Sequence, residues 1–290
     1  MSAADIAHAL GDARREGRGW RCRCPLHNGR SLTLRDGDGR CVLVTCWGGC
    51  DRLDVIAALR RRGLLDGRAI RHGAYAARRS NKDDGARTPR ALGIWREARQ
   101  AVGTLAEQYL ISRGLHLPPP PTLRFHVGLK HPSGGIWPGM VALVTRGVDD
   151  KPLAIHRTFL TCDGRGKAPI DPQKMMPGPC RGGAVRLAAP GDVLMVAEGI
   201  ETSLAAMLAT GHPAWAALST SGLRTLDLPN DVRDVIVLAD GDDPGEAAAR
   251  DCAWRWKREG RRVRIARPPQ GMDFNDMLLD RASRIEESAQ

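Results

Sequence analysis

The sequence is poor in aromatic residues and has no long apolar run. Aromatic side chains make up 4% of its 290 residues, and only two of them are tyrosines. No stretch approaches the ~18 apolar residues of a membrane-spanning helix, and no secretory leader is present, so we expect a cytoplasmic protein without a membrane partner. The eight cysteines then face a reducing compartment, where disulfides are not expected.

A covalent nucleophile is also missing from the sequence. No serine or cysteine stands in a pattern with a partner histidine, so covalent catalysis has no support. Of the two tyrosines, Tyr75 lies in a polar, charged segment and Tyr109 lies on an expected core helix. Neither position favours a tyrosine nucleophile.

Charge is distributed unevenly along the chain. Residues 1–90 carry 19 basic and 10 acidic side chains, residues 91–187 carry 13 and 6, and residues 188–290 carry 12 and 17. A basic front suits contact with a phosphate backbone, and an acidic rear suits metal binding. Because arginine greatly outnumbers lysine, coding bias contributes to the total of +11, and the asymmetry is more informative than the total.

Two apolar runs in the acidic part end at carboxylates. Val193–Ala197 is followed by Glu198, and Val235–Ala239 is followed by Asp240 and Asp242. Both runs have strand character, so the carboxylates are expected at the carboxyl ends of adjacent parallel strands. Carboxylates that converge repel one another unless a cation neutralises them, and such oxygen ligands suit Mg²⁺ or Mn²⁺. We predict catalysis on a phosphate, with Glu198 as base or second ligand.

Two pairs of metal-ligand residues stand near the amino terminus. Cys24 and His27 are separated by two residues, and Cys46 and Cys50 by three, with a β-type stretch between the pairs. Two turn-like pairs about a hairpin apart meet the requirement of a closed, tetrahedral zinc site with three cysteines and one histidine. We therefore predict that these four residues bind Zn²⁺.

Each pattern also has a structural alternative. Buried thiols are ordinary core residues, and Cys22 could replace Cys24 as a ligand, while Cys41 is spare. An acidic strand end can be a solvated loop or a helix cap, and Asp243 with Pro and Glu246 after it has the pattern of a cap. Asp243 is therefore expected to be structural.

The acidic elements resemble the Toprim domain, a metal-binding fold shared by bacterial primases, topoisomerases, some nucleases and recombination mediators. The resemblance rests on Glu198-Gly, on Asp240-x-Asp242 and on a third acidic element that starts at Asp273. It implies a Rossmann-like parallel sheet and adds Asp273 to the expected magnesium ligands.

Two positions depart from the pattern of bacterial primases. Thr202 stands four residues after Glu198, where the family usually has an aspartate, and Met272 stands where a lysine usually precedes the last cluster. These departures predict that any second metal site binds more weakly than in the family.

The amino-terminal pairs are similar to the CHC2 zinc ribbon that opens bacterial replicative primases. The second pair is one residue longer here, a variant expected of plasmid and phage relatives. A zinc ribbon followed by a Toprim domain is more specific than either motif alone. The combination implies a DNA primase that makes short RNA primers on single-stranded DNA from ribonucleoside triphosphates, with a separate helicase as partner.

The middle of the chain resembles the amino-terminal half of the primase polymerase core. The resemblance rests on Arg124 beside a phenylalanine, on Arg157 on an expected strand and on Lys167 in the loop that follows. It implies that these three residues bind template or nucleotide phosphates. The alternative is that each is a surface charge on an amphipathic strand, and Lys174 and Arg181 are weaker candidates.

The expected fold class is α/β. Residues 1–66 are expected to form the zinc ribbon, 67–90 a flexible basic linker, 91–187 an α+β primase-like subdomain, and 188–290 the carboxy-terminal Toprim domain with its Rossmann-like parallel sheet. Strands are expected over 122–127, 140–145, 153–160, 193–197, 214–218, 234–239 and 262–267, and helices over 91–113, 201–210 and 244–259.

Two other functions remain open. A Toprim nuclease would use the same acidic cluster to cut phosphodiesters, and would degrade single strands with Mn²⁺ and without nucleotides. A recombination mediator joins zinc and Toprim folds without catalysis, and would tolerate the loss of Asp240.

Overall fold

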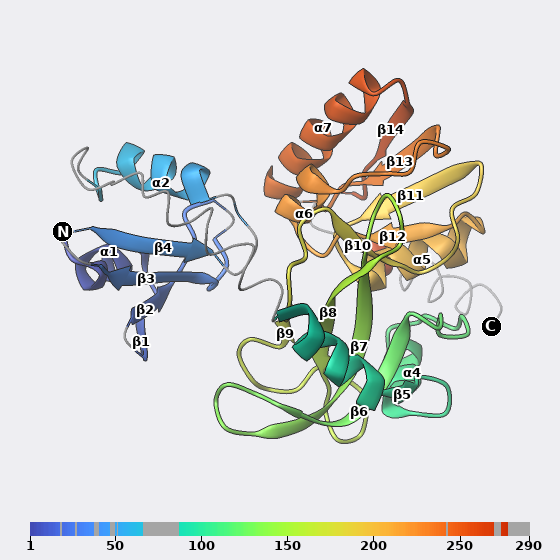
Figure 1. Cartoon of the computed structure of the whole chain (residues 1–290), viewed down its shortest axis with the longest axis horizontal. Helices are drawn as coiled ribbons and strands as arrows, with labels where there is room; N and C mark the ends of the chain where they lie inside the picture. Colours follow the sequence, from blue (N-terminus) through green and yellow to red (C-terminus); the bar gives the residue numbers. More distant parts are fainter. Residues whose placement is uncertain are drawn as a thin grey trace, which may run out of the picture. The chain divides into compact units, whose positions relative to one another are not determined.

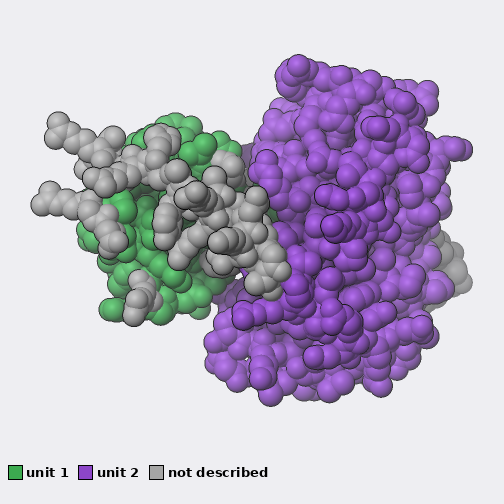
Figure 2. Space-filling model, in the orientation of Figure 1, with its two compact units in different colours: residues 1–78, 219–221 green, residues 79–218, 222–290 purple. Residues whose placement is uncertain are grey.

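The computed structural model describes residues 1–17, 19–26, 28–37, 41–46, 50, 52–65, 87–241, 243–269 and 274–277. The chain forms two compact units (Figure 2). Unit 1 comprises residues 1–78 and 219–221, and unit 2 comprises residues 79–218 and 222–290. None of the helices in the described ranges combines the length and the apolar character that a bilayer crossing requires.

Unit 1 is built on a four-stranded antiparallel sheet in the order β1-β2-β3-β4. Its elements are α1 (Ala3–Leu10), β1 (Arg14–Glu16), β2 (Gly19–Cys22), β3 (Leu32–Asp36), β4 (Val42–Cys46) and α2 (Arg52–Arg61). Ser2 and Asp5 form a capping box that starts α1. Ile6 of α1 and Leu32 of β3 are fully buried in the core of this unit.

Unit 2 is built on a mixed sheet of ten strands. The order is β14-β13-β11-β12-β10-β7-β6-β5, with β8 paired to β7 and β9 paired to β8. The strands are β5 (Arg99–Gln100), β6 (Leu123–Lys130), β7 (Ile136–Arg146), β8 (Pro152–Phe159), β9 (Lys174–Met175), β10 (Gly183–Arg186), β11 (Val193–Ala197), β12 (Ala214–Ala216), β13 (Asp234–Leu238) and β14 (Arg262–Ala266). The pairs among β14, β13, β11 and β12 are parallel, and the other pairs are antiparallel.

Helices cover both faces of the parallel strands (Figure 1). The described helices after residue 78 are residues 87–97, α4 (Leu105–Ser112), α5 (Ile200–Thr210), α6 (Thr220–Thr225) and α7 (Asp243–Arg258). The first two residues of α6 are assigned to unit 1, and the rest of these helices belong to unit 2. Because side chains alternate along a strand, Met195 of β11 packs with α5 while its neighbour Leu194 packs with α7 on the opposite face.

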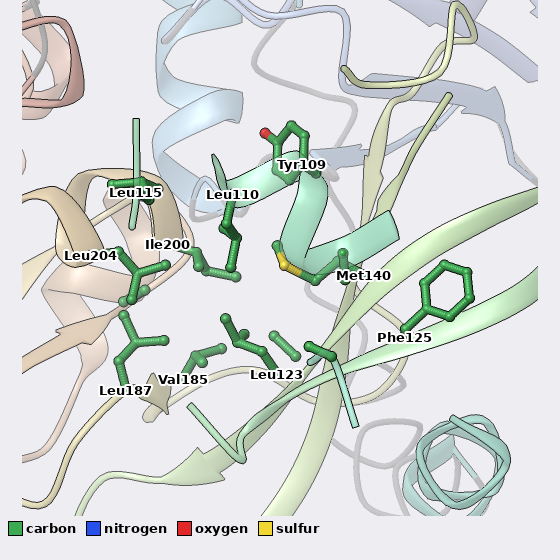
Figure 3. Close-up of a cluster of buried hydrophobic side chains, with 14 of the residues drawn as sticks. Tyr109, Leu110, Leu115, Leu123, Phe125, Met140, Val185, Leu187, Ile200 and Leu204 are labelled. Carbon is green, nitrogen blue, oxygen red and sulfur yellow. The ribbon is translucent and has the colours of Figure 1, made fainter. Parts of the chain in front are cut away.

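A further core joins the two halves of the sheet (Figure 3). Tyr109 and Leu110 of α4, Met140 of β7, and Ile200 and Leu204 of α5 are all buried in it. The antiparallel half and the parallel half therefore share one hydrophobic core.

The expected fold class is confirmed, since unit 2 is a mixed α/β structure with a parallel sheet. The strand expected over 193–197 has these bounds, and the helix expected over 201–210 begins one residue earlier. The domain boundaries at 66, 90 and 187 stay a prediction, and most of the expected linker over 67–90 lies outside the described residues.

The helical region expected over about 91–113 is confirmed in part, because it contains two helices and not one. Residues 87–97 form one helix, and α4 starts a second one after β5. The helical spacing continues across the break, but Gly103 adopts a left-handed φ of +70°, and the Thr104 hydroxyl caps α4 by accepting the Ala106 N–H. These two residues turn the chain between the helices.

Gly147 provides a test of how closely the two halves of unit 2 approach. A Cβ at this position would lie 1.8 Å from the backbone oxygen of Asp227, whereas a Cβ on Gly166 would have no atom within 4 Å. We predict that Gly147→Ala lowers the free energy of unfolding by about 1–3 kcal/mol, as overpacking does. Gly166→Ala should stay within about 0.5 kcal/mol. Denaturant unfolding of both variants checks this, and equal stability of the two would contradict the packing.

Candidate functional site

Glu198 stands where β11 gives way to α5. Its backbone carbonyl accepts the N–H of Leu218 at 2.8 Å, just beyond β12. Leu218 has a φ of +70°, a conformation that a branched residue rarely adopts and that clusters at functional sites. One oxygen of the Glu198 carboxylate is buried. Glu198 is therefore held at the carboxyl edge of the sheet by the strand beside it.

Asp240 occupies the matching position after β13. β11 and β13 are parallel neighbours whose register pairs Val196 with Val237. Glu198 lies two residues after Val196, and Asp240 lies three residues after Val237. Neighbouring strands of a sheet are about 4.8 Å apart. The backbone of Ala239 is fixed to Ala266 of β14 by an N–H to carbonyl bond of 3.0 Å. The structure thus brings Glu198 and Asp240 to the same edge of the sheet.

The other expected magnesium ligands, Asp242 and Asp273, lie outside the described residues. The third acidic element is described over 274–277, which is helical. There the fully buried Asn275 binds Arg113, its amide donating to the backbone oxygen at 3.1 Å and accepting from Nη2 at 2.9 Å. This contact ties the carboxy-terminal element to the end of α4.

The two described carboxylates fit a divalent cation. Each has one oxygen buried, and burying carboxylates close together is costly unless positive charge balances them. Carboxylate oxygens are the ligands that Mg²⁺ and Mn²⁺ prefer. α5 starts at Ile200, at the same edge, and the positive end of its dipole stabilises negative charge there, such as that of the carboxylates.

A buried ionic cluster lies beside this edge. Glu201, in the first turn of α5, is 7% exposed. Its Oε1 accepts a hydrogen bond from the Tyr109 hydroxyl at 2.6 Å and lies 3.5 Å from Lys167 Nζ. Its Oε2 accepts from Lys174 Nζ at 3.3 Å. Burial alone would raise the pKa of Glu201, but the two lysines and the tyrosine hydroxyl outweigh it and lower the pKa, so the carboxylate is ionised.

His156 lies on the same face of the sheet as Lys174. It is buried, and burial, helped by the charge of Lys174, lowers its pKa to about 3. It is therefore neutral near pH 7. The positive charge of this region comes from the lysines and not from the histidine.

The three predicted phosphate-binding residues do not form one patch. Arg124 and Arg157 flank Val141 across β6, β7 and β8, on one face of the sheet. Lys167 pairs with Glu201, whose helix packs on the other face. Their roles in binding stay predictions.

Arg124 and Arg157 make several contacts within the fold. Arg124 lies 4.2 Å from the centre of the Trp95 ring and donates to the carbonyls of Trp95 and Ala98 at 3.0 and 3.5 Å, which caps the carboxyl end of helix 87–97. Arg157 is 9% exposed and donates to the carbonyl of Lys130 at 3.4 Å.

In unit 1, three of the four predicted zinc ligands come together. The sulfurs of Cys24, Cys46 and Cys50 lie within 4.8 Å of one another, with Cys24 Sγ and Cys50 Sγ 3.8 Å apart. Zn–S bonds of about 2.3 Å in a tetrahedron place sulfurs roughly 3.8 Å apart, so the spacing fits a metal. The fourth predicted ligand, His27, lies outside the described residues.

Cys22 and Cys41 are not in this group of described cysteines. Cys22 is fully buried on β2 among apolar residues. Burial, with the nearby Cys24, raises the pKa of Cys22 to about 12. It remains a thiol at neutral pH and is a core residue.

Two family models match adjacent parts of the chain. A domain of unknown function (DUF7146) matches residues 85–187. The Toprim domain matches residues 193–283, which contain Glu198, Asp240 and the third acidic element. Residues 193–283 are a Toprim domain. The resemblance stated from the motifs is confirmed for this domain, and the clustered cysteines fit the zinc ribbon of the same resemblance.

Several solved structures of primases are similar to the chain at low identity. The Aquifex aeolicus primase, with its zinc-binding and RNA polymerase domains, is 14% identical, and the match covers 99% of this chain and 83% of that one with a TM-score of 0.42. A DnaG catalytic core is 18% identical over 71% and 78%, with a TM-score of 0.46. The primase fragment of the bacteriophage T7 primase-helicase protein is 16% identical over 67% and 74%, with a TM-score of 0.41. No curated protein matches the sequence.

Within the Toprim domain, Thr202 is 5% exposed in the first turn of α5. Its hydroxyl brings no negative charge where an aspartate is usual in bacterial primases. A weaker second metal site stays a prediction, and Met272 lies outside the described residues.

Tyr109 is not available as a nucleophile. It is 1% exposed, and its hydroxyl is bound to Glu201 of the Toprim domain. Burial and this carboxylate raise the pKa of Tyr109, so the phenolate is strongly disfavoured. Tyr109 is therefore unsuited to a tyrosine-dependent reaction, and Tyr75 lies outside the described residues.

The partnership of Glu201, Tyr109 and Lys174 is not predicted by the sequence patterns. The available signal was the second glutamate of Glu198-Gly-Ile-Glu201, which lies in the first turn of a helix whose other positions are mostly apolar. An ionised group on such a helix needs a partner. The partners stand 92 and 27 residues away, so spacing along the chain could not identify them.

Unit 1 yields a prediction for the metal. Freshly purified protein should contain one Zn²⁺ per chain, because three cysteines already stand at zinc-like spacing. Cys46→Ser should lose the metal and unfold residues 1–66, because metal binding supplies a large part of the folding free energy of so small a module. Cys22→Ser should retain it. Elemental analysis and circular dichroism check this, and a zinc content near zero in the wild type would end the assignment.

Proposed function

We propose that the protein is a DNA primase that makes short RNA primers on single-stranded DNA by metal-dependent nucleotidyl transfer. The observation that carries the proposal is the position of Glu198 and Asp240, which end adjacent parallel strands of a Toprim domain. The same continuous sheet carries the strands of the basic middle region. We infer that one substrate, which contains both phosphates and a bound metal, meets the acidic edge and basic groups of this region.

The acidic edge would perform the chemistry. Mg²⁺ or Mn²⁺ would be held by Glu198, Asp240, Asp242 and Asp273. When bound, the metal would neutralise the charge that develops on the transferred phosphate. Glu198 would accept the proton of the attacking 3′-hydroxyl. Arg124, Arg157 and Lys167 would bind template or nucleotide phosphates.

The amino-terminal unit would contact the template. Cys24, His27, Cys46 and Cys50 would hold a structural Zn²⁺, and residues 1–90, with net charge +9 from 19 basic and 10 acidic side chains, would bind the phosphate backbone of single-stranded DNA. The setting proposed is the cytoplasm, in the replication of a plasmid, phage or integrated element. A separate helicase would supply the single strand.

The test is incorporation of labelled ribonucleotides on a single-stranded template. Wild-type protein should make short RNA only when Mg²⁺ or Mn²⁺ is present. Asp240→Asn should lower kcat by about 100-fold or more, because it removes a charge that acts in the transition state, without lowering the thermal midpoint. Asp192→Asn is the matched control, since Asp192 is exposed at the opposite end of β11, and it should leave kcat unchanged.

Other outcomes of this assay would overturn the proposal. Degradation of the template with Mn²⁺ and without ribonucleotides would identify a nuclease. Template binding without synthesis, equal in the wild type and in Asp240→Asn, would identify a recombination mediator.

A further inference from the structure

The cluster around Glu201 is more elaborate than the fold requires. Its members come from three elements and a loop: Tyr109 on α4, Lys174 on β9, Glu201 on α5, and Lys167 after β8. A buried ion pair is a poor device for stability, because the cost of desolvating the charges offsets their attraction. Apolar side chains would fill the same space beside the shared core at no such cost.

Glu201 cannot move to reach a ligand. Its side chain is 9% exposed, and its Oε1 is held by the buried Tyr109 hydroxyl at 2.6 Å. A carboxylate fixed in this way holds the lysines in place and is not displaced when a ligand binds to them. Tyr109 in turn is fixed by the apolar core that surrounds it.

The two lysines keep an accessible side. The side chain of Lys167 is 28% exposed and that of Lys174 is 39% exposed. Each ammonium has three donors, and two ammonium groups share one carboxylate, so the cluster has surplus positive charge. The exposed part of the cluster is therefore cationic, and its buried part is anionic.

The cluster lies close to the acidic edge. Glu201 follows Glu198 by three residues, which limits the distance between their Cα atoms to roughly 11 Å. A ligand that carries several linked phosphates could contact the lysines at one end and the metal-binding carboxylates at the other.

We propose that Glu201, held by Tyr109, is a positioning residue that fixes Lys167 and Lys174 as a preformed cradle for the triphosphate of the incoming nucleotide. The inference rests on the proposed function, which supplies the nucleotide. It assigns roles to Tyr109 and Glu201 that the sequence motifs do not give, and it makes Lys174, a weaker candidate from the sequence, a phosphate ligand.

Glu201 also keeps the cradle charged. Burial and the neighbouring Lys174 lower the pKa of Lys167, and Arg113 lowers it further, whereas Glu201 raises it. These are the charged groups that face Lys167 from β9, from the end of α4 and from α5. Without the carboxylate, Lys167 would lose its proton at a lower pH than in the wild type.

Binding of inorganic tripolyphosphate to the full chain, measured by calorimetry without divalent metal, tests the cradle directly. Lys174→Gln and Glu201→Gln should each weaken binding about tenfold, the value of one charge-assisted hydrogen bond. Tyr109→Phe should weaken it less, because only the anchor of Glu201 is lost. Lys151→Gln is the control, since Lys151 is exposed in the turn before β8, and should match the wild type.

The dependence of affinity on pH separates positioning from a merely structural role. In Glu201→Gln, affinity should fall at a lower pH than in the wild type, because Lys167 deprotonates earlier. Unchanged or tighter binding in Glu201→Gln would overturn the inference, since a carboxylate that only competes with phosphate would give tighter binding when removed. If Glu201→Gln does not fold, Lys174→Gln and Tyr109→Phe decide, and wild-type affinity in both would overturn it.

Primer synthesis by the same variants distinguishes this inference from the proposed function. Glu201→Gln and Tyr109→Phe should raise the KM for ribonucleotide more than they lower kcat. If the wild type binds tripolyphosphate through Lys174 but makes no primers, the inference about the cradle is supported and the proposed primase function is contradicted. If the wild type makes primers and both variants have an unchanged KM, the proposed primase function is supported and the inference about the cradle is contradicted.

Discussion

The chemistry proposed for this protein depends on the antiparallel pairing of β10 with β12. This pairing, with Val185 opposite Ala216 and Arg186 opposite Trp215, joins the antiparallel strands of the middle region to the parallel strands of the Toprim domain. The Arg186 guanidinium also stacks 4.3 Å from the centre of the Trp215 ring. Because one sheet crosses this junction, the basic strands and the acidic edge keep a fixed relation within unit 2.

The sequence predicts best where a single local signal decides the structure. The run before Glu198 is apolar on both faces, so its strand over 193–197 has the expected bounds. Cys24, Cys46 and Cys50 cluster as their spacing predicts. The break within the helical region over 91–113 is not predicted, because apolar spacing continues through Gly103, while the turn there depends on a left-handed residue and a cap.

The remaining site residues depend on contacts that spacing cannot reveal. Glu201 meets Lys174 only because α5 packs under the antiparallel strands. Arg124 has the residue type expected of a phosphate ligand, yet the structure places it against Trp95 at the end of a helix. A basic residue beside apolar ones can serve either purpose, and only tertiary structure distinguishes the two.

The most direct measurement is Mn²⁺ binding to the full chain, followed by electron paramagnetic resonance. If Glu198 and Asp240 hold the catalytic metal, Asp240→Asn should weaken Mn²⁺ binding at least about tenfold, as the loss of one charged ligand implies. Asp192→Asn, at the end of β11 opposite to Glu198, should bind Mn²⁺ as the wild type does. Equal Mn²⁺ affinity in the wild type and in Asp240→Asn would contradict the account.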